Sequence, residues 1–158
     1  MTRVALRRLI LEGFGPFLSP VQVDFSPGLN CMVAANESGK SSLVSGLMAV
    51  IFGMPQRSDP AEFGQNRFRN WEGASVFRGE LEFEADGVSY RIERDFDTNR
   101  IAFAREEEGR RLSLATGVHN PLALRRNETY EGKLEEILRV NNRETFEAVF
   151  CVTQPIPE

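Results

Sequence analysis

A short stretch near the amino terminus restricts the fold more than any other part of the sequence. Residues 29–42 begin with an apolar run, pass through small and polar residues, and then enter an apolar pattern of helical spacing. Within this stretch, Ala34 to Ser41 match the pattern G-x-x-x-x-G-K-[ST], except that alanine stands at the first glycine. The order predicts a buried strand, a tight loop and a helix, which is the context in which such a loop binds a polyphosphate.

The residue types of this loop suit phosphate chemistry. Gly39 has no Cβ, so the backbone can approach an anion closely, and the unpaired N–H groups of the following helix would attract the anion. Lys40 would supply a point charge for the outer phosphates, and the hydroxyl of Ser41 could ligate magnesium. The candidate nucleotide-binding residues are Asn36, Glu37, Ser38, Gly39, Lys40, Ser41 and Ser42.

Two observations bear on the alternative, an ordinary turn between a strand and a helix. Lysine is scarce, because Lys40 and Lys133 are the only two in the sequence, and a lysine at this position therefore favours phosphate binding. Ala34 argues the other way if its position needs a positive φ, which would cost about 1–2 kcal/mol. If Ala34 is simply the last strand residue, the cost is close to zero, and the sequence leaves both cases open.

Composition predicts a globular chain. The 158 residues suggest one domain, and the net charge of −4 gives no support for nucleic-acid binding, so any DNA contact needs a local patch. Cys31 and Cys151 lie in apolar runs and are expected to be buried thiols in a reducing compartment. No stretch is long enough to span a membrane, and we expect a cytoplasmic protein.

The remaining elements follow from apolar periodicity. We expect strands at 4–11 and 21–25, a turn at 14–17, a helix at about 41–52, and a long loop from 54. Residues 76–115 predict an antiparallel meander with turns at 86–87, 97–99 and 106–109. A loop at 116–126 would hold His119 as a turn residue, a helix would begin near Thr129, and Asn142 would cap a second one.

The charged residues of the meander allow two interpretations. The residues concerned are Arg91, Glu93, Arg94 and Asp95. We expect them to face water, and the alternative is a basic stripe that faces DNA.

The order of these features resembles the amino-terminal half of the ATPase head of SMC-like proteins. The resemblance covers nearly the whole chain and rests on Phe14-Gly15-Pro16-Phe17, on residues 36–42, and on the closing pattern Phe146-x-x-x-Phe150-x-x-x-Gln154. The most similar branches are the SbcC type and the RecF-like and YhaN-like ATPases. The resemblance implies an α/β fold, namely a P-loop NTPase lobe of the ABC-ATPase type with a mixed core sheet, an antiparallel β-meander and a small helical segment.

The resemblance also implies site roles and cofactors. Gln154 matches the Q-loop glutamine, which helps to hold magnesium and the attacking water. The implied catalytic residues are Lys40 and Gln154, the implied metal ligands are Ser41 and Gln154, and the implied cofactors are ATP and Mg.

Several family motifs do not occur in this sequence. In the family, the Leu-Ser-Gly-Gly signature, the Walker B aspartate, the catalytic glutamate and the switch histidine lie in a second half beyond a coiled coil. Residues 112–117 faintly resemble the signature but precede the Q-loop. We therefore expect 1–158 to be a single amino-terminal lobe, either an excised piece or one half of a split head. Its parts would be 1–53 (hairpin, phosphate loop and helix), 54–75 (loop), 76–115 (meander) and 116–158 (helical segment and Q-loop).

Three functions remain open. The first is an ATPase lobe acting in DNA double-strand-break repair or chromosome maintenance, with ATP-gated dimerisation of heads controlling DNA binding. The implied partners are the chain's own C-terminal lobe, a second head, DNA and an SbcD-type nuclease subunit, and this sequence alone should hydrolyse little ATP. The second is a nucleotide-independent scaffolding or DNA-tethering module with a degenerate loop. The third is an unrelated P-loop NTPase, against which the lack of an Asn-Lys-x-Asp motif and of repeated βαβ units argues.

Overall fold

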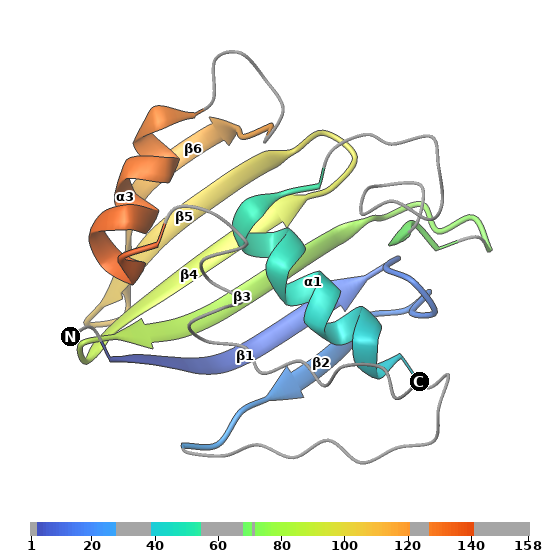
Figure 1. Ribbon diagram of the computed structural model, residues 1–158, viewed down its shortest axis with the longest axis horizontal. Coiled ribbons are helices and arrows are strands. Elements are labelled where there is room, and N and C mark those ends of the chain that lie inside the picture. Colours follow the sequence, from blue (N-terminus) through green and yellow to red (C-terminus); the bar gives the residue numbers. More distant parts are fainter. Residues whose placement is uncertain (1–2, 28–38, 55–67, 71, 121–126, 141–158) are drawn as a thin grey trace, which may run out of the picture.

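One antiparallel sheet with two helices on a single face makes up the described part of the protein (Figure 1). The computed structural model describes residues 3–27, 39–54, 68–70, 72–120 and 127–140. The strand order is β2-β1-β3-β4-β5-β6, and every pairing is antiparallel. The elements are β1 (Val4–Glu12), β2 (Val21–Asp24), α1 (Lys40–Phe52), β3 (Arg78–Ala85), β4 (Val88–Asp95), β5 (Arg100–Glu107), β6 (Arg110–Val118) and α3 (Glu128–Leu138).

The expectation of a mixed core sheet is not met in the described residues, because all six strands pair antiparallel. The buried strand expected at the start of residues 29–42 lies outside the described residues. The predicted meander is confirmed. Its three turns carry residues with positive φ, namely Asp86 (φ 50°), Asn99 (φ 56°) and Glu108 (φ 50°), each within the predicted turn.

The core lies between the sheet and the helices. One row of inward residues crosses five strands, in the order Leu9, Leu81, Ile92, Phe103 and Ala115, and all five are buried. α1 covers β1, β3 and β4, while α3 lies over β6 (Figure 1). No helix in the described ranges is both long enough and apolar enough to cross a membrane.

The opposite face of the sheet is charged. Arg91 ion-pairs with Glu80 (Nη1–Oε1 2.6 Å), with Glu82 and with Glu106 (Nε–Oε1 3.1 Å). Arg111 reaches Glu93 at 3.4 Å. The expectation that Arg91, Glu93 and Asp95 lie on the solvent side of the meander agrees with this arrangement.

Arg94 corrects that expectation, because it is only 2% exposed. Strand alternation places Arg94 on the inward face with Ile92, and in one cross-strand row with Gly79, Ile101 and Gly117. Gly79 leaves room there, since a Cβ on it would lie 2.5 Å from Val50 Cγ2. α1 therefore packs close to the sheet, and its backbone comes within reach of the Arg94 guanidinium.

Two further expectations, for His119 and for residues 116–118, are corrected by the structure. β6 continues through Val118, so residues 116–118 are strand rather than loop. His119 is 3% exposed and is not a solvated turn residue. Its backbone N–H donates to Asn99 O at 2.8 Å, which extends the pairing of the sheet by one residue.

Candidate nucleotide-binding site

The amino end of α1 is the described part of the predicted phosphate loop. Gly39 is its N-cap residue, has φ 94° and ψ 15°, and makes no side-chain capping hydrogen bond. The first turn contains no acidic residue. The N–H groups of this turn and the positive end of the helix dipole are therefore suited to an anion.

A turn from β1 covers this helix end. A Cβ added to Gly39 would lie 2.5 Å from Phe17 Cζ and 3.1 Å from Pro16 Cγ. Since φ 94° also disfavours any residue with a side chain, only glycine fits this position without strain. A Cβ on Gly15 would likewise lie 3.0 Å from Ser42 Oγ. The Phe-Gly-Pro-Phe segment therefore packs directly against the start of α1.

Residues 68–70 hold this turn in place. Asn70 donates through its backbone N–H to Gly13 O at 2.9 Å and through Nδ2 to Gly15 O at 2.8 Å. The Gly15 N–H donates to Phe68 O, and the rings of Phe68 and Phe14 stack with centroids 5.1 Å apart. Asn70 is only 4% exposed. No sequence pattern pointed to this role, because Asn70 lies within the stretch expected to be a long loop.

A buried polar cluster holds the other end of α1. Arg94 donates through Nε to Val50 O at 2.9 Å and through Nη2 to Ile51 O at 3.3 Å. The hydroxyl of Tyr130, on α3, donates to the same Ile51 oxygen at 2.6 Å. These carbonyls belong to the last turn of α1, where helical carbonyls lack partners within the helix.

Burial shifts the protonation equilibria of this cluster. Desolvation lowers the pKa of Arg94, although arginine stays protonated in proteins. Desolvation also raises the pKa of Tyr130 to about 12, against the opposing effect of the nearby Arg94 charge. Arg94 therefore acts as a buried cation, and Tyr130 acts as a neutral hydroxyl donor at ordinary pH.

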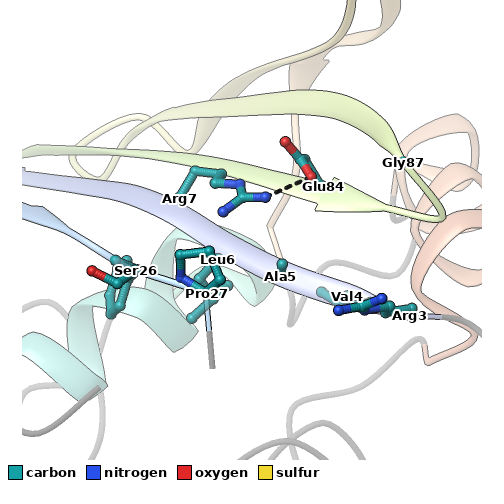
Figure 2. Close-up of a pocket in the computed structure, with 10 residues that line it drawn as sticks. Arg3, Val4, Ala5, Leu6, Arg7, Ser26, Pro27, Glu84 and Gly87 are labelled. Carbon is teal, nitrogen blue, oxygen red and sulfur yellow. Dashed lines mark hydrogen bonds and ion pairs between the residues drawn. The ribbon is translucent and has the colours of Figure 1, made fainter. Parts of the chain in front are cut away.

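A pocket lies at the other end of β1 (Figure 2). It has a volume of about 620 Å³ and is lined by residues 3–7, by 25–27 at the end of β2, and by Glu84 and Gly87. Arg7 already hydrogen-bonds Glu84 at 2.8 Å, which lowers the pKa of that carboxyl group. Gly15 and Phe17, which follow the far end of β1, lie against the start of α1. The pocket therefore lies away from the start of α1.

Comparison with known proteins decides the family. A family model described as an AAA domain matches residues 8–156. The chain belongs to this AAA domain family. A curated relative, the DNA double-strand break repair Rad50 ATPase of Sulfolobus acidocaldarius, is 27% identical over 122 residues. The aligned part is 77% of this chain but only 12% of that protein, so the chain spans a small fraction of the relative's length.

These matches confirm the predicted family. The chain corresponds to the amino-terminal region of SMC- and Rad50-like ABC ATPases. An AAA-type domain also fits the P-loop NTPase fold expected from residues 34–41.

The predicted site residues divide into two groups. Gly39, Ser41 and Ser42 lie at the amino end of α1, and Lys40 is its first residue. Ser41 is exposed, and Ser42 is half-buried beside Gly15. Asn36, Glu37, Ser38 and Gln154 lie outside the described residues. The predicted nucleotide, metal and catalytic roles of all these residues, in both groups, stay predictions.

The described residues fit the phosphate and magnesium expected of this family. An uncapped helix start with an exposed serine hydroxyl in its first turn suits both. The described ranges hold no group of three or more His, Cys, Asp or Glu side chains that could bind a metal. Such a group is not required, because magnesium at nucleotide sites takes few protein ligands and relies on substrate phosphates and water.

Proposed function

We propose that this chain is the ATP-binding amino-terminal lobe of an SMC-like ATPase. The observation that carries the proposal is the start of α1. Gly39 there is left-handed, packs under Phe17, and opens a helix whose first turn has no acidic residue and, among the described residues, no side-chain cap. Residues 34–41 add the loop pattern, and the family match adds the context.

In this proposal the residues at the helix start bind and orient the triphosphate. The N–H groups of the first turn of α1 donate to phosphate oxygens, and Lys40 offsets charge on the outer phosphates in the transition state. Ser41 offers a hydroxyl ligand and Gln154 an amide oxygen to the metal. Magnesium, when bound, neutralises phosphate charge during attack by water.

Hydrolysis would require residues from a second lobe. Residues 1–158 contain no Walker B carboxylate pair and no Leu-Ser-Gly-Gly signature. We therefore expect nucleotide binding with very slow turnover by this chain alone. The working enzyme would join this lobe to a C-terminal lobe and pair two heads around two ATP molecules.

A role in double-strand-break repair or chromosome maintenance is part of the proposal, supported by the name of the relative. ATP-gated closure of heads would control DNA binding, with an SbcD-type nuclease as a further partner and a cytoplasmic location. The outer face of the sheet is not the expected DNA surface. Its ion-pair network joins three arginines, Arg78, Arg91 and Arg111, to five glutamates, Glu12, Glu80, Glu82, Glu93 and Glu106. The excess negative charge repels DNA phosphates.

The test is a titration with ATP and magnesium. Binding is measured calorimetrically for the wild type, for Lys40→Ala, and for Lys133→Ala as a matched control. Lys133 is the other lysine of the chain and pairs with Glu136 on the exposed side of α3 at 3.3 Å. We expect Lys40→Ala to lose most of the affinity and Lys133→Ala to retain it. Equal behaviour of wild type and Lys40→Ala would favour the nucleotide-independent scaffolding module instead.

A further inference from the structure

The end of α1 opposite the phosphate site is tied to α3 by directional hydrogen bonds. Tyr130 O–H and Arg94 Nη2 both donate to Ile51 O, at 2.6 and 3.3 Å. Tyr130 is fully buried, and the Arg94 guanidinium carbon lies 5.6 Å from the centre of its ring. The last turn of α1 therefore contacts the first turn of α3 through polar groups as well as apolar packing.

His119 extends the same network to a second residue of α3. Arg94 Nη2 lies 2.9 Å from His119 Nδ1, and Arg94 Nη1 donates to His119 O at 3.0 Å. A guanidinium has only donors, so Nδ1 must accept and the ring proton must sit on Nε2. Nε2 in turn lies 3.1 Å from Glu131 Oε1 and donates to it. The chain of contacts thus runs from a buried cation through a neutral imidazole to a carboxylate on α3.

This hydrogen-bonded network restricts the relative position of α1 and α3 more tightly than apolar packing alone would. Replacing every member of a buried charged group by apolar residues is often neutral or stabilising, whereas removing one member leaves the others unpaired and is destabilising. The members of the network are satisfied only when α1 and α3 hold one relative position, because unpaired buried polar groups are costly. α1 has 13 residues and spans about 20 Å as a rigid rod. A tilt at its amino end therefore moves the carbonyls that Arg94 and Tyr130 bind.

We propose that Arg94 and Tyr130 are positioning residues that couple nucleotide binding at the amino end of α1 to the stability of α3. The inference rests on the proposed function and adds a regulation to the same site. The side chain of Asn127 caps the first turn of α3 by accepting a hydrogen bond from Tyr130 N–H at 3.1 Å. Tyr130 therefore belongs to the turn at which α3 begins, and restricting its motion stabilises the helix. Coupling between binding sites is reciprocal, and loss of the Tyr130 contact weakens nucleotide binding in turn.

The experiment is hydrogen exchange of the full chain with and without ATP and magnesium, followed for residues 128–138. We expect bound nucleotide to slow exchange of this helix several-fold in the wild type. Tyr130→Phe removes the hydroxyl and keeps the ring. It should abolish most of this slowing and weaken nucleotide affinity by about two- to tenfold, the equivalent of one hydrogen bond. The control is Tyr90→Phe, four residues before Arg94 on β4, which should behave as the wild type.

The outcomes separate this inference from the proposed function. Nucleotide binding without any change in exchange of 128–138 in the wild type overturns the coupling and leaves the ATP site intact. The coupling is equally overturned if Tyr130→Phe keeps both wild-type affinity and nucleotide-dependent slowing. A wild type that binds no nucleotide overturns the proposed function and the coupling together. The wild-type measurement decides the matter even if a variant folds poorly.

Discussion

Replacing Arg94 by methionine tests the network at its centre. Met fills much of the same space but donates no hydrogen bond, so Arg94→Met leaves the carbonyl oxygens of Val50 and His119 and the Nδ1 atom of His119 without this donor. Ile51 O keeps the Tyr130 hydroxyl. The stability of the variant therefore measures the net contribution of the four buried Arg94 hydrogen bonds after the cost of burying the cation is subtracted.

The expected loss follows from two opposing effects. Hydrogen bonds to a charged group contribute about 1.5–3 kcal/mol each. The sum for four such bonds is comparable to the whole net stability of a typical domain. Desolvation acts against them, and it is the leading cause of the lowered pKa of Arg94. Each buried neutral acceptor that loses its donor costs about 1–3 kcal/mol, so the three acceptors, less the relieved desolvation of the cation, give a net cost of about 3–5 kcal/mol. We expect Arg94→Met to lower the free energy of unfolding by this amount, a large share of the roughly 5–15 kcal/mol of a domain.

Urea denaturation followed by circular dichroism measures the effect. With a slope of about 1–3 kcal/mol per molar urea, the midpoint should fall by about 2 M. Arg94→Lys keeps the charge without the planar fork and should fall less. Arg100→Met, at an exposed position of β5, is the matched control and should stay within about 0.5 kcal/mol. A loss below about 1 kcal/mol for Arg94→Met would refute the view that the network holds α1 against α3.

Three further predictions use the same urea assay. A Cβ on Gly46 of α1 would lie 2.3 Å from Leu11 Cδ1, so Gly46→Ala should cost about 1–3 kcal/mol by overpacking. Gly132→Ala in α3, with nothing within 4 Å of the new Cβ, should instead gain roughly 0.5–1 kcal/mol; equal effects would contradict the packing argument. Asn127→Ala should cost about 1 kcal/mol as a lost N-cap, and no loss would mean that α3 does not depend on it. The pKa of Tyr130 is raised from 10.0 to about 12, so the unfolded chain loses this proton first and stability falls as pH rises from 10 to 12. The wild type should lose up to roughly 2–3 kcal/mol over this range and Tyr130→Phe should lose less; identical profiles would show that this hydroxyl does not titrate as described.

Local sequence was enough to predict most elements. Alternation of apolar and charged residues defined the strands of the meander, and Asp86-Gly87 placed its first hairpin turn, because these patterns depend on neighbouring residues only. The helix predicted at about 41–52 agrees with α1 at Lys40–Phe52, and Gly39 and Gly53 at its two ends both have positive φ. The family was also within reach of the sequence, since a loop motif with its flanking strand and helix is a local signature.

Tertiary structure decided what the same patterns could not. Arg94 bonds to residues 44 and 25 positions away, and Tyr130 bonds to one 79 positions away. The charge of Arg94 indicated a solvated residue, whereas the close approach of α1 over Gly79 turned it into the centre of a buried network. Periodicity reports which face a residue occupies. Only the packing of α1 and α3 on that face determines whether an arginine there meets water or the unpaired carbonyls of a helix end.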